Sequence, residues 1–197
     1  GSTIDSFGRL RTSNPHTIFD NYFVVDEKPR IWDTEVSNSG TYVFKANLSC
    51  VDMGVTNASG SKVIRQTKQY FQYQPGKSLL SLNTFVMNEG KANLRQRVGY
   101  FDNKDGIFLE REGNTAYIVK RSFVTGETVD TRVPQTQWNG DKLDGNSTSR
   151  LNLNLDKAQI FFSDIEWLGV GSVRTGFIID GEYHFAHTFH HANLESN

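Results

Sequence analysis

Cysteine is almost missing from this chain of 197 residues, in which Cys50 stands alone. A single cysteine excludes a disulfide framework within the chain, so Cys50 is interpreted as a small buried hydrophobic residue. Apolar stretches of more than a few residues are also missing, which excludes a membrane-spanning helix. The net charge is −1 and the pI is about 6.6, so no overall electrostatic field draws the chain to nucleic acid or acidic lipid.

Catalytic and cofactor motifs are missing too. The chain contains no G-x-S-x-G nucleophile elbow, and the segment 169–171 (GVG) is too short for a phosphate-binding loop and precedes a strand-like run. Residues Thr3 to Arg11 are polar and lack the apolar core of a signal peptide, so no secretion is expected. We therefore predict that the protein is not an enzyme and binds neither a cofactor nor a metal ion.

Alternation of apolar and polar residues with a period of two runs through the whole chain. In the segment 159–167, Phe161, Ile165 and Trp167 fall on one face of a strand, whereas Asp164 and Glu166 fall on the other. Thirteen such runs follow one another and are separated mostly by turns that contain glycine. They are Ile18–Val25, Arg30–Val36, Thr41–Val51, Lys62–Tyr73, Leu79–Met87, Asn93–Phe101, Ile107–Arg111, Ala116–Val124, Thr128–Val133, Arg150–Leu155, Gln159–Trp167, Ser172–Ile179 and Tyr183–His190.

This pattern predicts an all-β fold, an antiparallel β-sandwich of jelly-roll type, because regular returns let each sheet bury one apolar face. Residues 16–197 are predicted to form a single domain that follows an extended arm over residues 1–15. Gly1 and Ser2 carry no weight in this prediction, since removal of a tag also leaves such a pair. The longest irregular stretch, Pro134–Ser149, is expected to be a surface loop anchored by Trp138 and the first candidate for contacts.

Four histidines lie near the end of the sequence, at His184, His187, His190 and His191. Histidine is the commonest metal ligand, so the cluster is a candidate metal site or contact between subunits, including a threefold axis that gathers copies of one histidine. On a regular strand, however, residues 184 and 190 share one face and residues 187 and 191 share the other, at separations of roughly 13–20 Å. One ion cannot bridge that separation, and the pattern favours a structural role.

Carboxylates suggest chemistry in two places. Asp164 and Glu166 lie two apart on one strand face, roughly 6.5–7 Å from each other, which is within the range that glycosidases use. Outward-facing strand positions commonly carry acidic residues, however, so a solvated surface is favoured. The segment 102–106 (DNKDG) resembles a calcium-binding loop but lacks its ligand register, and it is predicted to be a hairpin turn.

Cationic and aromatic residues are interleaved in the segment 65–73, and Arg95 and Arg97 form a second cationic pair on one strand face. Single-strand nucleic-acid binders have this composition, but without a basic pI it favours contacts between subunits or the recognition of sugars. The predicted contact surface consists of Arg9, Arg11, Arg65, Lys68, Tyr70, Tyr73, Arg95, Arg97, Trp138, Asn139 and Asp141.

Five segments carry a resemblance to one family. They are DSFGRLRTSNPHTIFDN (5–21), RQTKQYFQYQPGKS (65–78), RQRVGYFDNKDGIFLE (95–110), WNGDKLDG (138–145) and QIFFSDIEWLGVGSVRTGFIIDG (159–181). In these segments the chain resembles β-rich proteins encoded by tailed phages, particularly aquatic ones, and by giant DNA viruses. The resemblance covers nearly the whole chain in order. Members of the family are uncharacterised or are regarded as structural proteins of the virion.

The resemblance implies a virion protein, either a capsid, a decoration or a tail-fibre component, and it supplies no catalytic residues. Such a protein would bind itself, as a homo-oligomer for which a trimer is one option, and would dock on other virion proteins. Exposed sheet edges and an arm over Asp5–Pro15 suit this role, because neighbouring subunits can cover both. Two alternatives remain open: a lectin-like module that uses Trp138 to bind host glycans, and, with less support, a polysaccharide-degrading enzyme built on Asp164 and Glu166.

Overall fold

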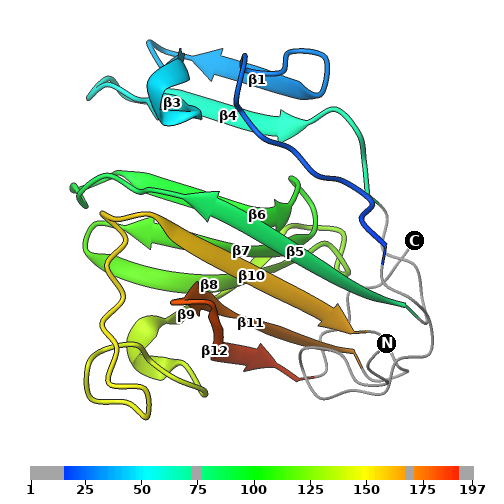
Figure 1. Ribbon diagram of the computed structural model, residues 1–197, viewed down its shortest axis with the longest axis vertical. Helices are drawn as coiled ribbons and strands as arrows, with labels where there is room; N and C mark the ends of the chain where they lie inside the picture. Colours follow the sequence, from blue (N-terminus) through cyan, green and yellow to red (C-terminus); the bar gives the residue numbers. More distant parts are fainter. Residues whose placement is uncertain (1–15, 72–76, 167–170, 191–197) are drawn as a thin grey trace. The chain divides into compact units, whose positions relative to one another are not determined.

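The computed structural model describes residues 16–71, 77–166 and 171–190 of the chain (Figure 1). Its strands pair in antiparallel sheets of two and four strands. These ranges contain no α-helix and only two 3-10 helices, η1 (Ala46–Leu48) and η2 (Gln135–Gln137). The predicted all-β, antiparallel class is therefore confirmed. No helix in the described part of the chain is long and apolar enough to cross a membrane.

The chain divides into two compact units, Gly1–Phe71 and Gln72–Asn197, and each is described by itself. The single domain over residues 16–197 stays a prediction, and so does the arm over residues 1–15, which lies outside the described residues. Both units are built from strands, but they differ greatly in how much hydrophobic side chain they bury.

The first unit contains two antiparallel sheets of two strands each. They consist of β1 (Trp32–Ser37) with β4 (Lys62–Thr67), and of β2 (Thr41–Lys45) with β3 (Cys50–Gly54). Short two-stranded sheets are marginally stable in water unless other groups pack on them. The side chains around these sheets therefore decide whether they persist.

Two strand predictions in the first unit are wrong. The segment Ile18–Val25 forms no strand. The run Thr41–Val51 is broken by η1, after which Ser49 adopts a left-handed backbone conformation with a φ of 49°. This break places half-buried Cys50 opposite Lys45 instead of in line with the apolar residues of β2.

An aromatic cluster surrounds Arg65 on the β1–β4 sheet. The Trp32 ring meets the rings of Phe19 and Phe23 at centroid distances of 6.1 and 5.6 Å. The Arg65 guanidinium lies 5.4 Å from the Trp32 ring and donates a hydrogen bond to Thr34 Oγ1 at 2.7 Å. Desolvation lowers the pKa of Arg65 from its ordinary value. The cluster ties the sheet to the segment before it, but its members remain partly exposed.

The two units differ sharply in burial. Every buried hydrophobic side chain among the described residues lies at Met87 or beyond, so the described part of the first unit contains none. That unit instead exposes twelve large hydrophobic side chains, whereas the second unit exposes five. The twelve are Ile18, Tyr22, Val24, Val25, Val36, Tyr42, Val43, Leu48, Met53, Val55, Ile64 and Tyr70.

The second unit contains two four-stranded antiparallel sheets, which we call the β10 sheet and the β7 sheet. The β10 sheet has the order β12 (Glu182–Phe189), β11 (Ser172–Ile179), β10 (Gln159–Glu166), β5 (Ser78–Phe85). The β7 sheet has the order β6 (Arg95–Phe101), β7 (Gly106–Glu112), β8 (Thr115–Ser122), β9 (Val129–Pro134).

Side chains from both sheets of the second unit form one hydrophobic core. The β7 sheet contributes Leu109 and Ile118, and the β10 sheet contributes Phe161 and Phe177, all of them fully buried. Trp138, from the segment between the sheets, belongs to the same cluster. The predicted burial of Phe161 is confirmed, whereas that of Trp167 lies outside the described residues.

The other face of the β10 sheet holds a second set of rings. Phe162 pairs with Gly176 on β11, and Gly176 pairs in turn with Phe185 on β12. The two rings meet edge to face at 5.4 Å, in the space that Gly176 leaves. A Cβ at this glycine would lie 2.9 Å from the Phe162 ring and 2.0 Å from the His184 carbonyl oxygen, so a side chain does not fit there.

The sequence predicts the turn at 102–106 correctly but not the irregular segment at 150–155. The hairpin predicted at 102–106 is confirmed, because the Asp102 amide donates to the Asp105 carbonyl at 2.9 Å between β6 and β7. The Asp102 carboxylate accepts from the amides of Lys104 and Asp105 at 2.7 and 2.8 Å. The strand predicted over Arg150–Leu155 is wrong, since that segment forms only an isolated bridge.

Candidate interaction face

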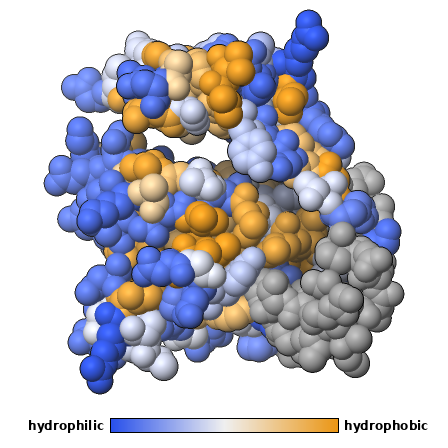
Figure 2. Space-filling view, in the orientation of Figure 1, coloured by the Kyte–Doolittle hydropathy of each residue, from blue (hydrophilic) through white to orange (hydrophobic). Residues whose placement is uncertain are grey.

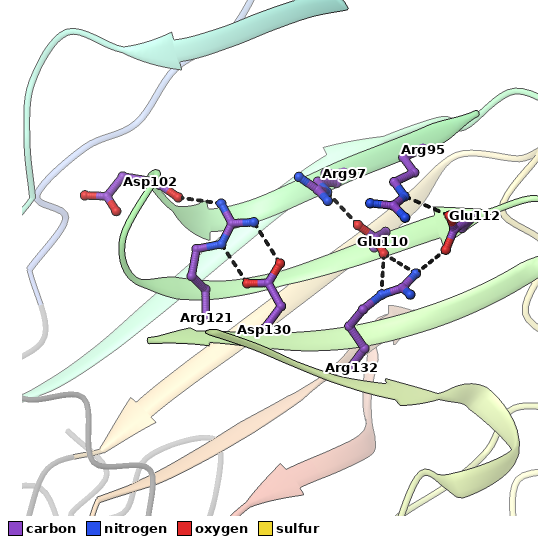
Figure 3. Close-up of polar contacts among 8 residues, drawn as sticks. All are labelled: Arg95, Arg97, Asp102, Glu110, Glu112, Arg121, Asp130 and Arg132. Atoms are coloured by element: carbon purple, nitrogen blue, oxygen red, sulfur yellow. Dashed lines mark hydrogen bonds and ion pairs between the residues drawn. The ribbon is translucent and has the colours of Figure 1, made fainter. Parts of the chain in front are cut away.

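The β7 sheet carries a dense group of charged side chains on the face opposite its core residues (Figure 3). Arg97 lies opposite Glu110 in the ladder, and Arg95 lies opposite Glu112. Directly opposed residues of antiparallel strands point to the same side of the sheet, so these four share one face. This ionic face consists of Arg95, Arg97, Glu110, Glu112, Arg121, Asp130 and Arg132.

Glu110 lies at the centre of the ionic face and is only 1% exposed. Its Oε2 accepts a hydrogen bond from Arg97 Nε at 2.6 Å, and its Oε1 accepts one from Arg132 Nε at 2.8 Å. A buried carboxylate without partners is very unfavourable, but paired and hydrogen-bonded oxygens compensate for the lost water. The two arginines therefore make this buried position tolerable for a glutamate.

Two further carboxylates complete the ionic face. Glu112 accepts hydrogen bonds from Arg95 and Arg132, and these bonds lower the pKa of Glu112 below its ordinary value. Arg121 donates two hydrogen bonds to the Asp130 carboxylate at 2.8 and 2.9 Å, and this bidentate pairing lowers the pKa of Asp130. Both carboxylates therefore remain ionised at neutral pH and below it.

Aromatic rings lie beneath the arginines. The guanidinium carbons of Arg97 and Arg121 lie 5.4 and 5.2 Å from the Phe108 ring, and that of Arg132 lies 4.1 Å from the Tyr117 ring. Cations stack favourably on aromatic faces at such distances. Phe108 is fully buried although it points away from the core of the unit. The arginine side chains thus cover an apolar layer as well as pairing with carboxylates.

The ionic face is nearly self-neutral. Four arginines against three carboxylates leave one positive charge in excess, and each carboxylate already has at least one arginine partner. Such an arrangement suits a rigid polar contact surface better than the capture of an anionic ligand. The structure therefore brings the predicted residues Arg95 and Arg97 together, but with carboxylate partners that the sequence did not reveal.

Trp138 from the predicted contact surface is a core residue. Its ring is 2% exposed and lies 6.2 Å from the Phe177 ring in a stacked arrangement. Its indole Nε1 donates a hydrogen bond to the Val133 carbonyl at 3.1 Å. The interpretation of Trp138 as a contact residue is therefore corrected: the ring anchors the loop, as expected, but cannot stack on a sugar.

The loop that follows Trp138 runs along the edge of β12. The Asn139 side chain donates to the Thr188 carbonyl at 2.9 Å and accepts from the Thr188 amide at 2.8 Å, as a neighbouring strand would. The Gly140 amide donates to the Ala186 carbonyl at 3.0 Å. This part of the predicted contact loop thus pairs with its own sheet and protects that edge.

Asp141 continues this pairing and also shapes the loop. Its amide donates to the Phe185 carbonyl at 2.8 Å. Its carboxylate accepts hydrogen bonds from the amides of Leu143 and Ser149 at 2.8 and 2.9 Å. Its role in the structure is therefore to hold the loop together.

The remaining predicted contact residues belong to the first unit, except Tyr73, which falls in the sequence of the second. Arg65 is half-buried in the aromatic cluster, whereas Lys68 and Tyr70 are exposed. The backbone amide of Lys68 donates to the Ile31 carbonyl at 2.8 Å. The strand predicted over Lys62–Tyr73 ends at Thr67. Three predicted residues lie outside the described residues, namely Arg9, Arg11 and Tyr73.

A β-bulge changes the predicted arrangement of the histidines. Thr175 pairs with His187 and Phe177 pairs with His184, and the ladder shifts between these pairs. Because residues 175 and 177 share a face of β11, His184 and His187 share a face of β12, and the assignment for a regular strand is wrong. His190 is exposed, and His191 lies outside the described residues.

His187 is buried and has a structural role in the contact between β12 and the loop. It is 8% exposed, its Nδ1 accepts the Asn139 amide at 3.3 Å, and its ring lies 4.6 Å from Phe189. Desolvation lowers the pKa of His187, which favours the neutral ring that this hydrogen bond requires. Within residues 16–71, 77–166 and 171–190, no group of three or more His, Cys, Asp and Glu side chains could hold a metal ion.

The carboxylates of β10 do not form the predicted solvated surface. Asp164 is fully buried, and its Oδ2 lies 2.9 Å from an Arg174 nitrogen. The same arginine lies 3.6 Å from Glu166. The prediction for Asp164 is wrong because β10 is covered on both faces, with Phe162 buried beside it. A polysaccharide would not reach this carboxylate in the arrangement described.

Five members of the ionic face were not anticipated as site residues: Glu110, Glu112, Arg121, Asp130 and Arg132. Alternation alone places Glu110 and Glu112 on one strand face, and Asp130 and Arg132 on another. Which arginines lie opposite which carboxylates depends on the pairing register of β6 through β9, which no local pattern specifies.

The residues above define an all-β protein with a nearly self-neutral ionic face and a sheet edge that is covered by its own loop. Comparison with protein families, curated proteins and solved structures finds no match to this chain. We therefore argue its function from its own residues and their contacts.

Proposed function

We propose that this chain is a structural protein of a virion, a capsid, decoration or tail-fibre component, which acts by binding further copies of itself and other virion proteins. The contrast in burial between the two units carries the proposal. The first unit exposes twelve large hydrophobic side chains and, among its described residues, buries none. Exposed hydrophobic side chains in this number, with none buried beside them, favour a surface that another protein covers.

Association would bury hydrophobic side chains that the first unit leaves exposed. Complete burial of a Val, Leu or Met side chain contributes roughly 1.5–3 kcal/mol, so covering a few of the twelve would stabilise the two-stranded sheets considerably. A second copy is the simplest partner, because a symmetric oligomer offers each subunit the same self-complementary surface. The protein would then be ordered as an assembly in a way that the isolated subunit is not.

One apolar pair illustrates the surface. Tyr42 on β2 lies directly opposite Met53 on β3, and both are exposed. Phe44 and Val51 follow on the same face of this sheet and are half-buried. In the view of Figure 2, hydrophobic surface gathers over the strands of the first unit. This sheet face is the part of the first unit that we expect a second copy to cover.

We also propose that the β10 and β7 sheets stack as a β-sandwich. Their common hydrophobic core supports this arrangement, because side chains of two stacked sheets interdigitate in this way. The β7 sheet is a meander of consecutive strands, and the β10 sheet is a meander to which β5 is added. The jelly-roll connection of the strands stays a prediction.

The alternatives gain no support from the residues that were to carry them. Trp138, the leading aromatic residue for a glycan site, lies in the core. Asp164, the first carboxylate of the hydrolase hypothesis, is buried and paired with Arg174. We therefore retain the structural role as the proposed function.

Immunogold labelling of purified virions, viewed in negative stain with antibodies against this chain, tests the proposal. We expect gold at one repeated position on intact particles, because a structural component occupies equivalent sites. Antibodies against a protein of the infected cell that is not packaged serve as the control. Particles that stay unlabelled while the chain is found only in the soluble lysate would contradict the proposal.

A further inference from the structure

The four edge strands of the second unit are protected to different degrees. Proteins discourage accidental pairing of sheet edges with covering loops, charged side chains, proline and bulges. The edge of β12 is covered by the loop at Asn139 and Gly140. The edge strand β9 carries Asp130 and Arg132 and ends at Pro134. Two of the four edges therefore have clear protection.

The edge strand β6 is protected in a third way. It carries Arg95 and Arg97, both engaged in the ionic face. The Gln96 side chain also accepts from the Asn88 amide and donates to the Asn88 carbonyl, each at 2.9 Å. The edge of β6 is therefore protected by charged side chains and by the contact between Gln96 and the backbone of Asn88.

The fourth edge strand, β5, has none of these features. Its sequence, SLLSLNTF, contains no charged residue and no proline. Its pairing with β10 runs without a shift from Ser78 to Phe85, so it contains no bulge. Within the described ranges, no backbone hydrogen bond joins β5 to any strand other than β10. An eight-residue edge of this kind is open to pairing with another strand.

The side chains beside this edge are apolar on one face. Leu80 and Leu82 are exposed, Leu82 by 52%, and Leu82 lies opposite Phe162 of β10. On the other face, the side-chain nitrogen Nδ2 of Asn83 donates a hydrogen bond to Ser81 Oγ at 3.1 Å, so these two polar side chains already satisfy each other in part. In Figure 2, a second hydrophobic patch lies over the sheet that contains β5.

We propose that β5 pairs antiparallel with β5 of a second copy, which joins two four-stranded β10 sheets into one continuous sheet across a twofold axis. The inference rests on the proposed self-association and names one contact through which it occurs. Antiparallel pairing of identical strands is isologous, so one exposed edge satisfies both subunits. With no charge on the strand, the pair places no like charges opposite each other.

The register of this pair follows from the pleat. The exposed leucines of the two strands lie on the same side of the joined sheet only when even-numbered residues of one copy oppose even-numbered residues of the other. A register centred on Ser81 meets this condition and places Leu80 of each copy opposite Leu82 of the other. The four leucines that are exposed in two separate subunits then form one apolar row. A second copy is therefore a better occupant than an unrelated strand, which would have to match this row.

Sedimentation velocity of the full chain over a range of concentrations tests the inference with three single variants. Leu82→Lys places a charge in the centre of the proposed strand pair. Val129→Lys is the matched control, because Val129 is 51% exposed at the start of the protected edge strand β9. Met53→Lys places a charge on the apolar sheet face of the first unit. Circular dichroism of each variant confirms that the fold is retained.

We expect Leu82→Lys to raise the dimer dissociation constant at least about tenfold, because lysine on an edge strand opposes strand pairing. Val129→Lys should leave it unchanged. A wild-type chain that stays monomeric would overturn both the strand pair and the proposed self-association. Association that Met53→Lys weakens and Leu82→Lys does not would overturn the strand pair alone. If Leu82→Lys unfolds the chain, slowed amide exchange of residues 79–85 in concentrated wild-type protein supports the pair, and unchanged exchange overturns it.

Discussion

Replacement of Trp138 with alanine should lower the free energy of unfolding by about 3–5 kcal/mol, the usual loss for a buried tryptophan. The ring is almost fully buried, stacks against Phe177 and belongs to the core cluster that both sheets of the second unit share. Its removal leaves a cavity and also leaves the Val133 carbonyl without the indole hydrogen bond. The loop along β12 would lose its anchor at the same time.

Urea unfolding followed by circular dichroism measures this loss. Val124→Ala is the control, because Val124 lies in the same unit, is 49% exposed, and its truncation should change the free energy of unfolding by less than about 0.5 kcal/mol. Trp138→Phe keeps an aromatic ring without the indole donor and should fall between the two. Equal stability of Trp138→Ala and the wild-type protein would show that Trp138 is exposed in solution and would restore it as a contact residue.

The second large effect is expected at Glu110, where Glu110→Gln should cost roughly 2–4 kcal/mol of folding free energy. The substitution keeps the shape of the side chain but removes the charge that compensates Arg97 and Arg132. Breaking a buried ion pair commonly costs more than this, but both arginines are about a third exposed and water can hydrate them in part.

Glu112→Gln provides the matched control for this prediction. Glu112 pairs with Arg95 and Arg132 on the same face but is 30% exposed, so its substitution should cost less than about 1 kcal/mol. Chemical denaturation of both variants at neutral pH gives the comparison. If the two variants lose the same stability, the ionic face is open to solvent and Glu110 is not its buried centre.

The strand pattern could be predicted from the sequence because alternation and turn chemistry are local properties. Phe161 and the hairpin at 102–106 lie where the pattern places them. The error at Thr41–Val51 has a physical cause, since η1 and the left-handed residue Ser49 turn the chain between β2 and β3, although the alternation of the sequence continues through them. Local periodicity cannot reveal such a break.

The candidate site could be predicted only in part because it depends on pairing between distant strands. The shared face of Arg95 and Arg97 follows from their spacing, but their partners at Glu110 and Glu112 follow from register. Likewise, the bulge between His184 and His187 adds one residue and moves a histidine to the other face. The burial of Asp164 arises because β10 has neighbours on both faces.

The central claim is that the first unit is completed by association. Hydrogen exchange of backbone amides in the full chain, measured in concentrated and in dilute solution, tests it most directly. We expect the amides of β1, β2, β3 and β4 to exchange at least about tenfold faster on dilution, while those of β7, β8, β10 and β11 keep the same protection in both solutions. Equal protection of β1 to β4 at every concentration would contradict the claim, because the first unit would then be stable within a single subunit.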